Sequence, residues 1–257
     1  PSNFIDTEFE ETGLALAVPD DGYDGSLGSM ACTPVTVSGI TSSTLSAAME
    51  LAIDHTWVGD MTVKLENPNG DVLGVMSRPG FAEPADDGTS GFGDSSNLLA
   101  TSPVIFSDDG LVSAEAMGGA TPGGSSGVVC QDDAECEFTA APDTVAQPPG
   151  DFASLASSGD PNGDWNVCVG DSGGGDLGTV SAVKVIISEA VTTYPSLHLP
   201  LVITGFPEQP DIDVTPLSLA ATIDADMTTD LNLNIANSPV AGADLNWTFG
   251  AGNFSLV

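Results

Sequence analysis

Short stretches of alternating apolar and polar residues dominate the chain and predict β-strands. They occur at residues 35–39, 61–67, 72–77, 102–108, 165–171 and 180–188. Turn clusters rich in Gly, Pro, Asn and Asp separate them, such as NPNG at 67–70. Only TLSAAMELA at 44–52 is compatible with a helix, and its continuation alternates better as a strand. Many short strands between such turns predict an all-β fold, a jelly-roll-like β-sandwich.

The pattern divides the chain into four segments. Residues 1–17 are acidic without turn signals and are interpreted as a tail or the end of a preceding region. Residues 18–189 carry the alternating runs and form the predicted sandwich. The stretch 190–210 contains four prolines, which predicts an extended linker. Residues 211–257 alternate again but have about half the length of an immunoglobulin-like sandwich, so we expect an incomplete domain of that kind.

Within the strands, alternation predicts which side chains form the core. We expect the apolar residues of MTVKL and WNVCV to face inward and the polar ones outward, except where Cys168 forms a bridge. The aromatic residues Trp57, Phe106 and Trp165 are predicted to pack in the core rather than to stack on a ligand.

The charge of the chain is extreme and restricts its partners. The sequence holds 37 Asp or Glu and three Lys or Arg, a formal net charge of −34. Nucleic acid binding and attraction to anionic membranes both require many basic side chains, so both are excluded. No apolar run is long enough to insert into a membrane. Such a surface repels itself unless salt screens it or cations bind it, which predicts a saline or calcium-containing environment.

Four cysteines lack the spacing of a zinc site and favour two disulfides. Cys130 and Cys136 enclose only five residues, which suits a local loop, whereas Cys32 and Cys168 lie in strand-like stretches and are able to bridge them. Four cysteines allow three pairings, and the sequence does not decide among them. Disulfides predict an oxidising, extracellular location.

Several stretches together resemble the P domain of proprotein convertases, which is also widespread in secreted bacterial proteins. The similarity runs from AVPDDGYDG at 17–25 through DHTWVGDMTVKLENPNGDVL at 54–73 and FSDDG at 106–110 to NGDWNVCVGDSGGGDLGTVSAVKVII at 162–187. The resemblance implies a jelly-roll sandwich without an active site, accompanying a protease or standing in a large secreted protein. Residues 211–249 resemble, more weakly, an immunoglobulin-like repeat of bacterial surface proteins.

Acidic loops at strand ends are candidate calcium sites, because Ca²⁺ prefers carboxylate and carbonyl oxygens. The favoured ligands begin or end strands, where loops distant in sequence can meet: Asp60, Asp108, Asp171 and Asp176. Further candidates lie in other acidic turns: Asp20, Asp21, Asp24, Asp86, Asp87, Asp94 and Asp109. Any one of these clusters can equally be solvated surface.

One string invites a different interpretation. GDSGG at 170–174 also surrounds the nucleophile of trypsin-like proteases, and His55 and Asp108 precede Ser172 in the matching order. The expected Pro after the glycines is absent, and no Cys follows His55, so we interpret the string as a strand-closing turn. His55 is expected to fix a loop by hydrogen bonding, while His198 lies alone in the linker.

These observations predict a non-catalytic, calcium-stabilised accessory module of a secreted or cell-surface bacterial protein. Its expected partners are neighbouring domains of the same polypeptide, other surface proteins or a second copy. The alternative is a structural or adhesive component of an extracellular assembly, and a serine hydrolase is a minor one.

Overall fold

The computed structural model describes residues 4–89, 91–119, 127–132, 135–140, 148 and 150–190, and the backbone of 212–215 and 234–237. The chain forms two units, Pro1–Val191 and Thr192–Val257. In the second unit, β11 (Ile212–Thr215) and β12 (Asn234–Asn237) form an antiparallel pair. Ala190, the first residue of the expected linker, ends β10; the other residues of the linker and of the expected immunoglobulin-like domain, including His198, lie outside the described ranges.

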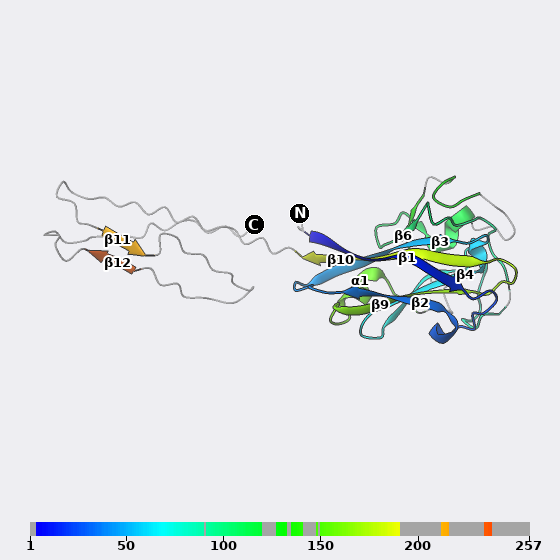
Figure 1. The fold of residues 1–257 in the computed structure, drawn as a ribbon, viewed down its shortest axis with the longest axis horizontal. Coiled ribbons are helices and arrows are strands. Elements are labelled where there is room, and N and C mark those ends of the chain that lie inside the picture. Colours follow the sequence, from blue (N-terminus) through cyan, green and yellow to red (C-terminus); the bar gives the residue numbers. More distant parts are fainter. Residues whose placement is uncertain are drawn as a thin grey trace. The chain divides into compact units, whose positions relative to one another are not determined.

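The first unit is a β-sandwich of two sheets, which confirms the predicted all-β class (Figure 1). One sheet has the order β1-β10-β3-β6-β8-β7, from β1 (Phe4–Val18), β10 (Gly178–Ala190), β3 (Thr44–Asp54), β6 (Val104–Phe106), β8 (Glu137–Thr139) and β7 (Val112–Ser113). The other has the order β2-β9-β4-β5, from β2 (Ala31–Val37), β9 (Gly163–Asp171), β4 (Met61–Glu66) and β5 (Val72–Ser77). Short helices connect them: η1 (Leu27–Ser29), η2 (Val58–Asp60), η3 (Ala114–Gly119) and α1 (Phe152–Ser157).

The predicted strands are present, and the ambiguous stretch at 44–52 is part of strand β3. The interpretation of residues 1–17 as a tail is wrong. Strand β1 pairs with β10 from Phe4↔Ala190 to Val18↔Gly178 and belongs to the first unit. Its alternating acidic and apolar residues are those of an edge strand, which is exposed on its outer face and along one side.

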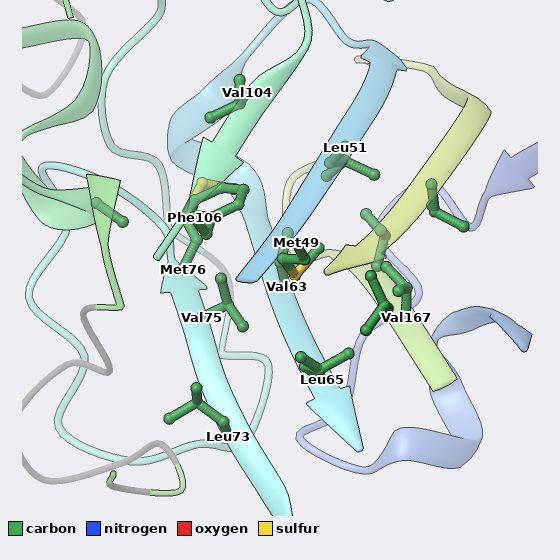
Figure 2. Close-up of a cluster of buried hydrophobic side chains, with 14 of the residues drawn as sticks. Met49, Leu51, Val63, Leu65, Leu73, Val75, Met76, Val104, Phe106 and Val167 are labelled. Carbon is green, nitrogen blue, oxygen red and sulfur yellow. The ribbon is translucent and has the colours of Figure 1, made fainter. Parts of the chain in front are cut away.

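The core lies between the two sheets and consists of the predicted apolar positions (Figure 2). Met49 and Leu51 of β3 and Val63 and Leu65 of β4, in the opposite sheet, belong to this one buried cluster. As expected, Phe106 and Trp165 are buried. Trp57 is only partly buried; its ring packs edge-on against Phe92 at 6.0 Å, and its indole N–H donates to the Gly93 carbonyl.

The outer face of the four-stranded sheet differs from the expected pattern. Thr62 and Lys64 of β4 were predicted to face solvent, but they are 0% and 3% exposed. The loop before β2 covers this face: a Cβ at Gly170 would lie 2.7 Å from the ring of Tyr23. The alternation of apolar and polar residues predicts that β4 has an inner and an outer face. It does not predict that loops cover the outer face.

Lys64 joins this cover to the sheet. Its ammonium group donates to Asp86 Oδ2 at 2.6 Å and to the Gly25 carbonyl at 3.1 Å, and it lies 5.2 Å from the ring centroid of Tyr23. The Tyr23 hydroxyl donates to the other carboxylate oxygen of Asp86. One buried cation therefore connects two loops that are distant in sequence.

We expect Lys64→Met to lower the free energy of unfolding by about 2 kcal/mol, because it removes the charged partner of the largely buried Asp86 carboxylate. Urea unfolding of the purified chain measures this loss. Lys184→Met is the matched control, since Lys184 pairs with Glu8, whose side chain is 60% exposed. That exposed pair should contribute no more than about 1 kcal/mol; an equal loss in both variants would contradict the role assigned to Lys64.

The structure confirms one of the two suggested disulfides. Cys32 and Cys168 are bonded and lie directly opposite each other in the β2–β9 pairing. The suggested bridge between Cys130 and Cys136 is not formed: both are thiols, and Cys136 Sγ lies 3.5 Å from the Cys130 carbonyl oxygen. The short separation places the residues together, but the Cys136 side chain contacts backbone. A disulfide is typical of an oxidising compartment.

Within the described ranges, none of the helices has the length and apolar character needed to cross a bilayer.

Candidate functional site

A buried histidine–carboxylate pair lies at one end of the four-stranded sheet. His55 follows β3 and Asp171 ends β9, and His55 Nε2 lies 3.1 Å from Asp171 Oδ2. The backbone N–H of Trp57 donates to His55 Nδ1 at 3.1 Å. Because a backbone N–H only donates, Nδ1 accepts, and Nε2 carries the proton that it shares with Asp171. His55 thus fixes the loop after β3, as the sequence predicted.

The loop after β9 is tied to the loop after β1. The amide of Asp21 donates to the Gly173 carbonyl at 3.2 Å, and the amide of Tyr23 donates to the Asp171 carbonyl at 3.0 Å. Asp20 Oδ1 accepts a hydrogen bond from the amide of Gly175 at 2.8 Å. These bonds place Asp20 and Asp21 beside the loop that carries Asp171.

Asp60 is the central carboxylate of this end of the sandwich. It closes η2 just before β4, is 3% exposed, and its carbonyl accepts the amide of Ser172 at 3.0 Å. Burial raises the pKa of Asp60 from 3.8 to about 7, and the nearby negative charges of Asp171 and Asp176 add to this increase. A carboxylate in such a place is stable only when a proton or another cation neutralises it.

Asp60 and two residues near it in the chain or in the strand pairing carry side-chain oxygens without a partner. Among the described residues, Asp60 Oδ1, Thr62 Oγ1 and Ser172 Oγ are buried without a hydrogen-bond partner. Buried polar groups in native proteins are nearly always paired, so several such atoms at one end of one sheet indicate a place for a bound water or cation. We call Asp60, Thr62, Ser172 and Asp171 the β4–β9 site.

Close packing explains why glycine occupies positions 170 and 173 of the GDSGG string. A Cβ at Gly173 would lie 2.2 Å from Asp60 Oδ2, and a Cβ at Gly170 would meet the Tyr23 ring. Any larger residue at Gly173 would displace the Asp60 carboxylate. The string is therefore explained by the close approach of Asp60 and Tyr23 to the end of β9.

The protease-like residue order is not assembled in space. Both ring nitrogens of His55 are engaged, by Asp171 and by the Trp57 amide. Asp108 accepts hydrogen bonds from the amides of Phe152 and Ala153, at 2.9 and 2.8 Å, and so holds the start of α1. A nucleophilic serine requires a base within hydrogen-bonding reach, and Ser172 Oγ has no hydrogen-bond partner among the described residues.

Of the four favoured calcium ligands, the structure brings three close enough for their charges to interact: Asp60, Asp171 and Asp176. Asp108 makes its contacts at α1 instead. The Thr56 hydroxyl donates to Asp176 Oδ1 at 2.5 Å, which holds that side chain at the exposed edge of the cluster.

The further candidates have local roles. Asp24 accepts from the amide and hydroxyl of Ser26, and these bonds lower its pKa to about 2. Asp87 accepts from the amide and hydroxyl of Thr89, and these bonds lower the pKa of Asp87. Of the remaining candidates, Asp86 binds Lys64 and Asp94 accepts from Ser96. Asp109 is exposed, and its backbone amide donates to Ser107 Oγ. Hydrogen bonds within turns account for most of these.

The donor set tests whether calcium fits. In the described part of the chain, no three His, Cys, Asp or Glu side chains are arranged to hold a metal ion. A three-carboxylate cage is therefore not preformed. Ca²⁺ binds carboxylate oxygens and also neutral oxygens, and the site holds one buried carboxylate oxygen, Asp60 Oδ1, and two buried hydroxyl oxygens, Ser172 Oγ and Thr62 Oγ1. The residues fit a site with few carboxylates.

Sequence reasoning missed two members of the site. Ser172 was considered only as a nucleophile, and Thr62 was expected to be exposed. A buried hydroxyl in a strand has no signature in the alternation pattern. The only available signal was the short distance in sequence of Ser172 from Asp171 and of Thr62 from Asp60.

Comparison with known proteins adds only remote likenesses. No protein-family model and no curated protein sequence matches the chain. Among solved structures it is similar to a serine protease of Aeromonas sobria, in complex with its chaperone ORF2 (10% identity, TM-score 0.39) and in a structure of the protease (12%, 0.36). These matches cover 75% and 74% of this chain but only 28% and 27% of the other chain. FlhE matches over 72% of this chain and 98% of its own, at 9% identity and a TM-score of 0.32. Likenesses of this size carry no argument about function.

Proposed function

We propose that this chain is a non-catalytic, calcium-stabilised accessory module of a secreted or cell-surface bacterial protein, and that it makes contacts with neighbouring domains. The observation that carries the calcium part is the buried Asp60, with one oxygen lacking a partner and two further carboxylates near it. The disulfide between Cys32 and Cys168 supports an extracellular location. The P-domain resemblance and the packing role of GDSGG support an accessory module rather than a hydrolase, and the resemblance also supports a protease as the neighbouring domain.

In the proposed site, Asp60 supplies the carboxylate oxygen, and Ser172 and Thr62 supply hydroxyl oxygens. A cation bound there would offset the repulsion among Asp60, Asp171 and Asp176 and would hold the end of β9 against the start of β4. Its contribution is structural, because it neutralises charge at the point where the loops after β1 and β9 meet.

We expect Ca²⁺ to stabilise the chain beyond the effect of salt. At free Ca²⁺ of roughly 100 times Kd, the free energy of unfolding rises by about 2.7 kcal/mol. Thermal melting in CaCl₂ and in NaCl of equal ionic strength separates binding from screening of the −34 charge. Mg²⁺ should be less effective, because it dehydrates reluctantly.

Asp60→Asn should remove the calcium-specific increment, whereas the exposed Asp109→Asn, with the same change of charge, should keep it. Identical melting curves in CaCl₂ and matched NaCl would contradict the calcium proposal. If Ca²⁺ stabilises Asp60→Asn as much as the parent chain, the cation binds at a site other than Asp60.

One observation favours the alternative, a structural or adhesive component of an extracellular assembly. Each of the three basic side chains is paired with carboxylates of this chain, Lys64 with Asp86, Arg78 with Glu83, and Lys184 with Glu8 and Glu50. The surface is therefore left almost purely acidic, and cations can bridge such surfaces between molecules. Sedimentation velocity distinguishes the two functions: an accessory module stays monomeric in Ca²⁺, whereas an adhesive component associates.

A further inference from the structure

Strand β1 is a long and open edge of the six-stranded sheet (Figure 1). It runs for 15 residues, and in the described part of the chain β10 is the one strand that pairs with it. No backbone hydrogen bond joins its other side to a loop of the described chain. An edge of this kind presents backbone N–H and C=O groups to which another strand can bind.

The usual devices that protect an edge are missing from its first part. Neither Pro nor Lys occurs between Phe4 and Val18. The register with β10 is irregular only between Thr12 and Leu16, where Gly13 has a φ of 69°. From Phe4 to Thr12 the pairing is unbroken, and acidic side chains are the remaining protection.

Three of the four acidic side chains between Phe4 and Thr12 lie on one face of the strand, and Glu11 lies on the other. Asp6, Glu8 and Glu10 alternate along β1, and residues at alternate positions share a face of the sheet. On the opposite face, Phe9 packs against the core, and Ile5 is 56% exposed. An added strand that matches both faces carries basic side chains at alternate positions and apolar side chains between them.

The same surface already binds a cation from a neighbouring strand. Lys184 of β10 places its Nζ 3.1 Å from Glu8 Oε2 and 3.8 Å from Glu50 Oε2. Glu10 lies directly opposite Lys184 in the register. A second copy of β1 would instead bring its own acidic side chains against Glu8 and Glu10, and like charges in facing positions are destabilising. Charge complementarity therefore selects a basic strand.

We propose that the Phe4–Thr12 edge of β1 binds an extended, basic segment of another polypeptide, which pairs with it as an added strand. This inference rests on the proposed function as an interaction module and names the kind of partner. The β1 edge shares no residue with the β4–β9 site, so an experiment can refute the edge-strand proposal and leave the calcium proposal intact, or the reverse.

The test uses the whole chain and a synthetic peptide of alternating Lys and Val, as long as the Phe4–Thr12 segment, with blocked ends. A Lys–Pro peptide with the same number of lysines is the control, because proline lacks the backbone donor and is excluded from paired strands. Titration calorimetry at physiological salt measures affinity, and amide hydrogen exchange locates the binding. We expect the Lys–Val peptide to bind and to protect amides of β1, and the Lys–Pro peptide to bind at least tenfold more weakly.

Variants of the chain test the charge argument. Glu8→Gln/Glu10→Gln should weaken binding of the Lys–Val peptide about fivefold, because two facing charge pairs are lost. Asp71→Asn/Asp109→Asn removes the same charge from two exposed positions elsewhere and should leave binding within twofold. Equal binding of the two peptides, protection outside β1, or self-association of the free chain through β1 would overturn the proposal. If the calcium increment persists in that case, the proposed accessory function still stands.

Discussion

We expect the Cys32→Ser/Cys168→Ser variant to lose about 5 kcal/mol of the free energy of unfolding, because the bridge closes a large loop in the unfolded chain. The two cysteines are separated by 136 positions, and loop-closure entropy grows with the logarithm of that separation. In the folded state the residues are neighbours in the β2–β9 pairing whether or not they are bonded. The bridge therefore acts mainly on the unfolded state. Equilibrium urea unfolding measures the loss.

The Cys130→Ser/Cys136→Ser variant is the matched control. It also replaces two cysteines, but these are thiols in the structure and close no loop. Its stability should stay within about 1 kcal/mol of the parent chain, as for most substitutions without a named structural mechanism. A large loss in this control, or no loss in the first variant, would contradict the disulfide assignment.

We expect Asp60→Asn to abolish a decline in stability between pH 4 and pH 8 in calcium-free buffer. Asp60 has a pKa of about 7 in the folded chain and an ordinary value of 3.8, so between these values the folded state holds a proton that the unfolded state has released. Stability therefore falls as the pH rises through this window and levels off above about 7. Since a shift of one pKa unit corresponds to about 1.4 kcal/mol, the fall attributable to Asp60 is about 4 kcal/mol.

Well below pH 3.8, Asp60 is protonated in both the folded and the unfolded state, and the stability of the variant should match that of the parent chain. At pH 8 the variant should be more stable by several kcal/mol in the absence of Ca²⁺, and adding Ca²⁺ should narrow the difference by stabilising only the parent chain. The measurement is a series of urea unfolding curves at different pH values. The exposed Asp109→Asn corrects for the general effect of removing one negative charge. If the parent chain and Asp60→Asn show parallel pH profiles, Asp60 does not titrate near neutrality.

The strands could be predicted because the information is local. The alternation in MTVKL and WNVCV marks β4 and β9, and the buried Val63, Leu65 and Val167 follow from period two. The acidic residues at strand ends could also be chosen from the sequence, since strand ends gather at the ends of a sandwich.

The alternation pattern does not determine which of the two sheets a strand joins. The sheet to which each strand belongs determines which acidic residues come together. Met61 of β4 lies opposite Asp171 of β9 in the four-stranded sheet, which places Asp60 beside the end of β9. Asp108 follows β6, which belongs to the six-stranded sheet, and it binds the start of α1. Only the pairing of strands distant in sequence separates these carboxylates.

The sequence by itself determined the all-β class, the strand positions and the strongly acidic character of the chain, because periodicity and composition are local properties. The tertiary structure decided three features that depend on distant contacts. It made residues 4–18 an edge strand rather than a tail, through pairing with β10. It buried Thr62 and Lys64 under loops, and it left Asp60 beside Asp171 with an unpartnered oxygen. Burial and charge coupling arise only when segments far apart in the sequence come together, and for this reason the candidate site and the raised pKa of Asp60 appear only in the folded chain.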